Sequence, residues 1–350
     1  MTVNGFIKYT MVFIIPALFV VGLFVGGWWT FGAVGFAFGI IPLLEILFQP
    51  NSKNLSKLEN EMLKEDPRYD YLLYLVLPVI YTCIALFLFT ISSYEYEVFE
   101  YFGLVFSLGV VLGGLGINVA HELGHRSSRF ERFLAKALLL PSAYMHFFIE
   151  HNYGHHKNVS TLEDPASARY NESVYVFWLR SVLFSYTSAW KIENKRLKRK
   201  GIKALSIQNE MVRFSLITIF FFALIFVVFG WFVFALFAAS SVIGFLLLET
   251  VNYIEHYGLA RKKLSENRYE RVTPIHSWNS NHVIGRIMLF ELSRHSDHHY
   301  KPNKKYQLLD HHQDSPQMPT GYPGMMMLSL IPPVWFFLMN KRIPRTLISE

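Results

Sequence analysis

The chain has 350 residues, of which 52% are hydrophobic and 17% aromatic, and its formal net charge is +7. This composition is too apolar for a soluble globular domain, and the apolar residues are grouped in long runs, which predicts an integral membrane protein. The single cysteine, Cys83, excludes an internal disulfide and any iron–sulfur or rubredoxin-type site built on four cysteines, and no base-reading motif accompanies the positive charge, so we expect no nucleic-acid partner.

Six apolar runs are long enough to cross a bilayer, whose hydrocarbon core requires about 20 residues per helix. They are Phe6–Trp28, Phe31–Phe48, Tyr71–Ile91, Val98–Ala120, Phe214–Gly230 and Trp231–Tyr253. A weaker apolar stretch, Phe133–Ile149, is more typical of an interfacial or re-entrant segment. Because the sequence has no internal repeat or linker, we expect residues 1–350 to form a single all-α membrane domain with six transmembrane helices.

Lysine and arginine are absent from three long stretches that contain all six runs, namely Tyr9–Ser52, Tyr69–His125 and Phe214–Ala260. Because basic loops are retained in the cytoplasm, both termini and all basic loops are predicted to be cytoplasmic. The most basic segment, Lys191–Lys203, holds seven cations and one acid. Such a segment is typical of contact with lipid headgroups, and docking of an acidic redox protein is the alternative.

Nine of the fourteen histidines lie in three clusters and one further position, each beside an apolar run. The positions are His121 and His125; His151, His155 and His156; His256; and His295, His298 and His299. On helices each cluster would project from about one face, so several imidazoles could converge on one point. With six crossings, all four groups lie on the cytoplasmic side. Nine imidazoles exceed the needs of one tetrahedral ion but suit two metals with four or five ligands each.

Acids beside the clusters are candidate partners for the second ring nitrogens, which a metal-bound imidazole usually keeps hydrogen-bonded. These acids are Glu122, Glu150, Asp164, Glu255 and Asp297. Surface salt bridges are the alternative for some of them, and spacing alone does not distinguish the two roles. The isolated histidines are expected to be ordinary polar or core residues; they are His146, His276, His282, His311 and His312. Imidazole binds several metals, so the ligand type leaves the metal open.

The segments HELGH (121–125), EHNYGHH (150–156), NYIEHYGL (252–259) and LSRHSDHH (292–299), in this order among these spans, resemble the integral-membrane alkane monooxygenases, which are non-haem di-iron enzymes. TLEDPASARYNES (161–173), HSWNSN (276–281) and PTGYPGM (319–325) are also similar to that family, so the resemblance covers most of the chain. Arg126, Ser293 and Tyr300 depart from the usual family residues, and none of these departures removes a histidine.

The resemblance implies that two iron ions are held by the nine histidines, His121, His125, His151, His155, His156, His256, His295, His298 and His299. It also implies hydroxylation of medium- to long-chain n-alkanes to 1-alkanols with O2, a separate rubredoxin with its reductase as the electron donor, and a location in the bacterial inner membrane.

An alkane has no polar handle, so its selection depends on the shape of an apolar channel. Small residues form a stripe in the second run, which we interpret as a deep channel for medium to long chains; they are Gly32, Gly35, Ala37 and Gly39. Packing between helices through small residues is the alternative interpretation of the stripe.

Three other functions stay open. A related di-iron membrane oxygenase or desaturase would act on alkyl-aromatic or fatty-acyl substrates. A membrane zinc protease is favoured only by HELGH, in which two histidines would bind zinc and the glutamate would act as general base. A metal permease or sensor would place histidines along several spans rather than on one side of the membrane.

Overall fold

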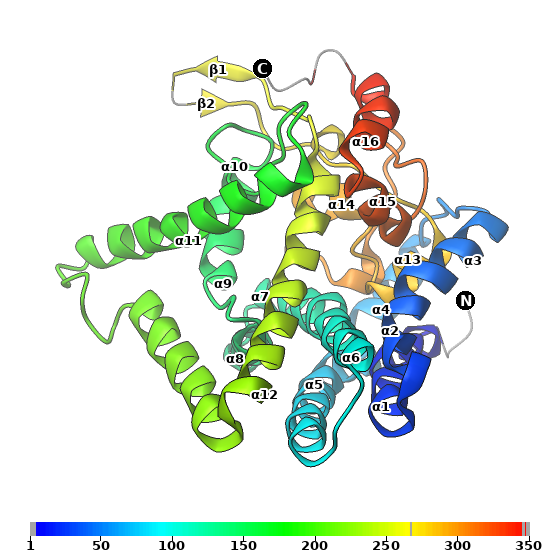
Figure 1. Ribbon diagram of the computed structural model, residues 1–350. Coiled ribbons are helices and arrows are strands. Elements are labelled where there is room, and N and C mark those ends of the chain that lie inside the picture. The colour runs from blue at the N-terminus through cyan, green and yellow to red at the C-terminus, as the bar shows by residue number, and fades with distance from the viewer. Residues whose placement is uncertain (1–4, 267, 345–346, 348–350) are drawn as a thin grey trace.

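The computed structural model describes residues 5–266, 268–344 and 347, and this part of the chain is mainly helical (Figure 1). In chain order the helices are α1 (Ile14–Val25), α2 (Gly32–Gly35), α3 (Ile41–Leu47), α4 (Lys57–Lys64), α5 (Arg68–Ser93), α6 (Val98–Val110), α7 (Asn118–Gly124), α8 (Arg129–Leu139), α9 (Phe147–Glu150), α10 (His156–Asn158), α11 (Val174–Lys198), α12 (Glu210–His256), α13 (Val283–Met288), α14 (His295–Tyr300), α15 (Tyr322–Ser329) and α16 (Pro332–Met339). The strands β1 (Lys263–Ser265) and β2 (Arg268–Tyr269) pair in antiparallel fashion.

Three π-helical turns interrupt or extend the helices: η3 (Phe36–Ile40), η4 (Val111–Ile117) and η6 (His151–His155). The turn η3 joins α2 to α3 within the second apolar run, and η4 joins α6 to α7, so that one long helical stretch runs from Val98 to Gly124. The turn η6 carries two of the clustered histidines.

Five helical stretches among the described residues are long and apolar enough to cross a membrane: Ile7–Val25, Gly27–Leu47, Arg68–Ser93, Val98–Gly124 and Glu210–His256. The last stretch is α12, which consists of two helices joined at Gly230. Gly230 has φ 79° and ψ 173°, a conformation that favours glycine, and the chain reverses direction there (Figure 1). The expected runs Phe214–Gly230 and Trp231–Tyr253 are therefore the two halves of α12, and the number of crossings stays a prediction.

The long helical stretch Val98–Gly124 is the most buried of the five, and it packs against the second half of α12. A Cβ atom on Gly113 would lie 2.4 Å from the carbonyl oxygen of Gly244, so the two backbones approach more closely than any other residue at position 113 would allow. The first half of α12 instead exposes large apolar side chains such as Phe220 and Val227. Exposed apolar surface on helices of this length is typical of lipid contact.

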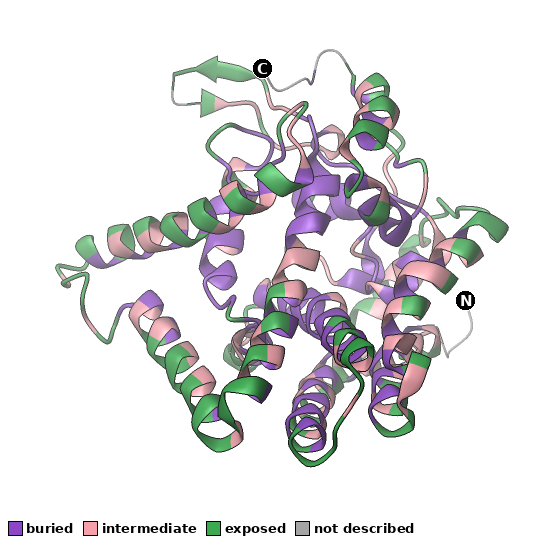
Figure 2. Cartoon of the chain, in the orientation of Figure 1, coloured by how far each residue is buried: buried purple, intermediate pink, exposed green. Residues whose placement is uncertain are grey.

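Short helices and loops cover one end of the long helices, and their buried residues gather around α14 and the end of α12 (Figure 2). Helix α8 buries Leu134 and Leu138 and exposes Phe130 and Phe133. The weaker apolar stretch Phe133–Ile149 thus forms the short helices α8 and α9 rather than one long helix. This end of the molecule carries all the clustered histidines.

Candidate metal centre

Five of the predicted ligands form one group: His121, His125, His151, His156 and His298. Three segments supply them: His121 lies in α7 and His125 directly follows it, His151 is the first residue of η6 and His156 directly follows that turn, and His298 lies in α14. One nitrogen from each ring lies within 4.8 Å of every other in the group, so these residues could hold a metal ion. His125 and His156 are partly exposed and the other three are buried.

The other four predicted ligands form a second group of the same kind: His155, His256, His295 and His299. All four are buried. His155 belongs to η6, His256 is the last residue of α12, and the other two come from α14. The second half of α12 thus carries one histidine from the long helices to the same end as α7.

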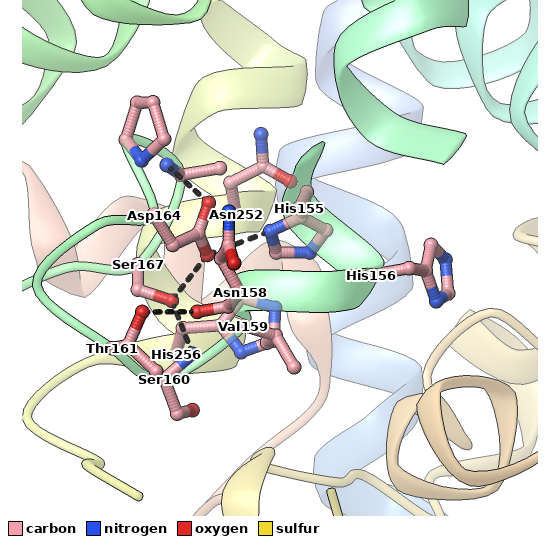
Figure 3. A network of polar contacts seen from close by, with 12 residues as sticks. His155, His156, Asn158, Val159, Ser160, Thr161, Asp164, Ser167, Asn252 and His256 are labelled. Carbon is pink, nitrogen blue, oxygen red and sulfur yellow. Dashed lines mark hydrogen bonds and ion pairs between the residues drawn. The ribbon is translucent and has the colours of Figure 1, made fainter. Parts of the chain in front are cut away.

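The π turn η6 explains how the cluster at 151–156 is divided between the groups. In an α-helix, residues five apart point about 140° away from each other, whereas a π turn forms i to i+5 hydrogen bonds and brings such residues into line. The Nε2 atoms of His151 and His156 are 3.0 Å apart, and His155 points into the other group. Figure 3 shows His155 and His156 projecting in different directions from the same turn.

The spacing of the ring nitrogens is compatible with shared metal ions. Six pairs of Nε2 atoms lie 2.9 to 3.2 Å apart, three pairs within each group. Two nitrogens bound to one ion at about 2.1 Å and at a right angle would lie about 3 Å apart. The buried Nε2 atom of His121 has no hydrogen-bond partner among the described residues, which also fits an atom that faces a cation.

Burial favours the neutral imidazole of His151, His156, His295, His298 and His299, and the neutral form is the one that binds metals. Burial and, after it, the neighbouring imidazoles hold the pKa of His151, His298 and His299 well below the usual value. The same two causes lower the pKa of His156 and His295. These five rings can therefore coordinate a metal ion without first losing a proton.

Asp164 holds His155 in place. Its Oδ2 atom lies 2.8 Å from Nδ1 of His155 and accepts a hydrogen bond of 2.6 Å from the Ser167 hydroxyl (Figure 3). Burial opposes ionisation, but the neighbouring His155 holds the pKa of Asp164 below its usual value. The carboxylate thus orients the ring so that Nε2 faces His299 at 3.2 Å. No regular spacing relates Ser167 to the histidine clusters, so the sequence did not indicate this role.

Glu255 faces the four-histidine group from the inner side. Its Oε2 atom is 3.1 Å from Nε2 of His295, the same nitrogen that faces His256 and His299. From the sequence, Glu255 was a candidate partner for the ring nitrogen that does not bind the metal. The structure instead places the carboxylate on the side where the histidine donors converge, and its side chain is 1% exposed.

The three remaining acids have other contacts. Glu122 accepts a hydrogen bond of 2.6 Å from Arg126 and another from the backbone of Tyr306, rather than from a clustered histidine. Asp297 accepts from Lys304 and contacts His312, and so joins α14 to the loop that follows it.

Glu150 lies 3.4 Å from the Ser188 hydroxyl, and its pKa is raised well above the usual value by burial and by nearby Asp164 and Glu249. Its contact is therefore also not the expected one to a histidine ring.

The isolated histidines lie outside both groups within the part of the chain that the structure describes. Four of them are hydrogen-bonded to other residues: His276 with Thr273 and Glu270, His282 with Ser280, His311 with Asn281, and His312 with Asp297. His146 is buried between the rings of Tyr144 and Tyr186.

An apolar cavity of about 80 Å³ ends at the histidines. Its wall includes His121 and His151 of the five-histidine group, His295 of the four-histidine group, and apolar side chains from the long helices. From the stripe in the second run, Ala37 contributes to this wall. Gly35 and Gly39 face open space instead, since a Cβ atom there would meet no described atom within 4 Å, and Gly32 packs on Leu18.

The chain resembles known proteins over nearly its whole length. Residues 99–329 match the Fatty acid desaturase family. The chain is 39% identical to Alkane 1-monooxygenase 1 of Alcanivorax borkumensis, covering 94% of this chain and 82% of that protein, and 38% identical to Alkane 1-monooxygenase of Pseudomonas putida, covering 92% and 81%. It is 27% identical to the xylene/toluene monooxygenase hydroxylase component of Pseudomonas putida, covering 96% and 88%. The chain is therefore a member of the alkane 1-monooxygenase family of integral membrane proteins, within the fatty acid desaturase family.

Proposed function

We propose that this protein hydroxylates medium- to long-chain n-alkanes at the terminal carbon to give 1-alkanols, with O2 and two electrons from rubredoxin. The observation that carries the proposal is the apolar cavity between the long helices, whose wall contains histidines of both groups. A substrate without polar atoms would be held there by shape and would present one end to the histidines. The names of the relatives agree with this substrate class.

The nine histidines would hold two iron ions, five in one site and four in the other. We further propose that the Glu255 carboxylate is the fifth donor of the four-histidine site, because it lies beside the nitrogen of His295 that faces the other donors. When bound, the iron pair would supply the activation of O2 that inserts one oxygen atom into a C–H bond. Asp164 would keep the His155 ring oriented, and the neutral rings would bind iron without first losing protons.

The apolar wall would exclude water and position the terminal carbon. The polar side chains in the wall other than the histidines are few: Asn118, Asn252 and Glu255. Because the rest of the wall is apolar, an alkyl chain is more stable there than in water along its whole length, by about 0.8 kcal/mol per methylene group. The gain increases with chain length as long as the cavity accommodates the chain.

Electrons would come from a separate rubredoxin that is reduced by its reductase. Cys83 is buried in α5, so this chain has no cysteine site that could supply them. His125 and His156, both in the five-histidine group, are the two clustered histidines that are partly exposed. The donor would approach the metals on their side. We place this side, and both termini, in the cytoplasm and the protein in the bacterial inner membrane, in accordance with the distribution of lysine and arginine.

Oxidation of alkyl side chains on aromatic rings is the second candidate function, and the likeness to the xylene/toluene enzyme favours it. One experiment separates the two. The purified protein, with rubredoxin and its reductase, is supplied in air with octane, hexadecane, xylene and a palmitoyl substrate, and products and bound iron are measured on the same sample.

We expect 1-octanol or 1-hexadecanol and about two iron ions per chain. Methylbenzyl alcohol as the main product would support the second candidate, and a desaturated or hydroxylated acyl product would assign the protein to lipid modification. One zinc ion per chain and no iron would support the zinc protease alternative. An anaerobic sample and a sample without reductase are the controls.

A further inference from the structure

A cleft with basic walls lies at the end of the molecule that carries the histidines. It has two adjoining parts, of about 170 and 190 Å³. Five residues belong to the walls of both parts: Lys8, Lys53, Leu55, Arg286 and Glu291. Arg294 lines the second part. A water molecule takes up about 30 Å³ in the liquid, so each part of this basic cleft has room for a group of several heavy atoms.

The basic cleft lies where two apolar helical stretches end. Lys8 is the second residue of the stretch Ile7–Val25, and Lys53 follows shortly after the stretch Gly27–Leu47. Helix α13 packs on both the 3-10 helix η1 (Ile7–Phe13) and α3, and contributes to the wall of the cleft (Figure 1). The outer face of α3 exposes large apolar side chains, which is typical of lipid contact. The cleft therefore lies at the level expected for lipid headgroups.

Cations outnumber acids in the wall of the basic cleft. The cations are Lys8, Lys53, Arg286 and Arg294, and the acids are Glu59 and Glu291. Glu59 is already engaged in the capping box at the start of α4. The cleft therefore holds more positive charge than its own carboxylates balance. Charge that is removed from water is costly unless an opposite charge pairs with it, so this wall favours an anion.

The buried charged groups of the wall leave one donor without a partner. Glu291 is 3% exposed, and its two oxygens accept hydrogen bonds from Tyr9 at 2.7 Å and from Arg286 at 2.6 Å. Arg294 is 2% exposed, and its two terminal nitrogens donate to backbone carbonyls. The Nε atom of Arg294 has no hydrogen-bond partner among the described residues. A buried donor without a partner is rare, and in a positively charged cleft it suits the oxygen of an anion.

We propose that the basic cleft binds the phosphate group of an anionic phospholipid from the leaflet on the histidine side. A phosphate offers several acceptor oxygens, which would pair with the ammonium groups of Lys8 and Lys53 and with Nε of Arg294. The acyl chains of the lipid would lie along the exposed apolar face of α3. Basic pockets between membrane helices on the cytoplasmic side bind such headgroups in other proteins. The proposal does not depend on the reaction that the protein catalyses.

A bound phosphate would also stabilise a segment that carries histidines. Arg294 directly precedes His295, the first residue of α14, and its guanidinium donates to the backbone of Lys53 at 2.9 Å. This contact joins the start of α14 to the segment that follows α3. An anion in the cleft would offset the repulsion between Arg286 and Arg294. We therefore expect anionic phospholipid to raise the unfolding temperature of the protein.

Native mass spectrometry of the purified, iron-loaded protein tests the site. The wild type, the double variant Lys8→Gln/Lys53→Gln and the control Lys57→Gln/Lys64→Gln are titrated with phosphatidylglycerol. The control removes two exposed cations from α4 that lie outside the wall of the cleft. One lysine near a membrane surface contributes about fivefold to lipid affinity, so the dissociation constant of the most tightly bound lipid should rise about 25-fold in the first variant. The control should stay close to the wild type.

Thermal unfolding of the same proteins in neutral detergent is the second readout, and neither readout uses turnover. Phosphatidylglycerol should raise the unfolding temperature of the wild type and the control more than that of Lys8→Gln/Lys53→Gln, and more than phosphatidylcholine does. Inorganic phosphate alone should have no effect. If Lys8→Gln reduces folding, the single variant Lys53→Gln, whose side chain is exposed, should still raise the dissociation constant about fivefold.

Three results would overturn the proposal. The first is an unchanged affinity for phosphatidylglycerol in the folded cleft variants. The second is an equal loss of affinity in the control, which would show general attraction to the basic surface. The third is an equal rise of the unfolding temperature with inorganic phosphate alone, which would assign the cleft to a soluble anion instead of a lipid.

Discussion

At the scale of single residues, the division of nine histidines into five and four is the feature with the most direct consequence. His298 and His299 are neighbours in α14, yet they belong to different groups. If each group holds one ion, removing either ring should weaken one site more than the other. The two sites are thus separable by single substitutions.

We predict that His298→Ala and His299→Ala each lower the iron content from about two ions per chain towards one and abolish hydroxylation, while the protein still inserts into the membrane. His282→Ala is the matched control, because His282 lies outside both groups and contacts Ser280. Iron analysis on purified, folded variants measures the effect. Full iron content and activity in His298→Ala would refute its assignment as a ligand.

The lowered pKa values of the buried histidines predict a direction for the effect of pH. Histidines of the unfolded chain titrate near pH 6.5, whereas in the folded chain burial keeps rings such as His151, His295 and His299 neutral below that pH. As pH falls through about 6.5, protons bind preferentially to the unfolded chain, so stability decreases and bound metal is released. Above about pH 7 these histidines are neutral in both the folded and the unfolded chain, so they should change neither the stability nor the amount of bound metal.

The measurement is the unfolding temperature, with and without iron, between pH 7.5 and 5.5. Ordinary carboxyl groups titrate near pH 4 and lie outside this window. Buried Glu150, whose pKa is raised, opposes the effect of the histidines, so the measurement is made in a Glu150→Gln background. An unfolding temperature that stays constant or rises as the pH is lowered to 5.5 would contradict the prediction.

At the scale of secondary-structure elements, the close packing of η4 on α12 positions two of the segments that carry histidines. Gly113 is in backbone contact with Gly244; His121 lies in α7, which directly continues η4, and His256 is the last residue of α12. A side chain at position 113 would push the elements apart. The spacing between the two elements therefore also affects the spacing within the metal centre.

We predict that Gly113→Ala lowers the free energy of unfolding by about 1–3 kcal/mol, as overpacking of a close contact usually does, and also lowers the iron content. Gly39→Ala is the matched control, because a Cβ atom there meets open space. Thermal unfolding of both variants in the same detergent measures the difference. Equal stability of Gly113→Ala and the wild type would show that the helices can adjust without cost.

At the scale of the whole molecule, the basic segment Lys191–Lys203 lies at the end of α11, on the left edge of Figure 1, whereas the histidines lie near α9 and α14. The side chain of Glu193 accepts a hydrogen bond from the backbone of Glu210, so the segment lies beside the start of the apolar helix α12. A basic surface at that position suits anionic lipid headgroups better than an electron donor, which must come close to the metals.

We predict that replacing Lys198, Arg199 and Lys200 by glutamine weakens binding to anionic lipid, by about 1 kcal/mol per charge, and leaves the KM for rubredoxin unchanged. All three side chains are exposed, so folding should not be affected. Lipid binding is measured by exchange between neutral and anionic nanodiscs, and KM by steady-state turnover at two salt concentrations. A raised KM together with a loss of its salt dependence would support docking of the donor instead.

The amino-acid sequence by itself indicated a helical membrane protein, the positions of its apolar helices and the nine histidines that gather at one end. These features depend on hydropathy and on spacing along the chain, which are local properties. Tertiary structure decided which histidines share a group, because the π turn η6 aligns His151 with His156, and it placed Glu255 on the inner side of His295 and Glu122 against Arg126. It also decided which of the small residues in the second apolar run lines the cavity, since the direction of each side chain depends on how the helices pack. The contact between Glu255 and His295 joins residues far apart in the chain. The contacts of His151 with His156 and of Glu122 with Arg126 are local, but they depend on a π turn and on side-chain directions that spacing alone does not specify.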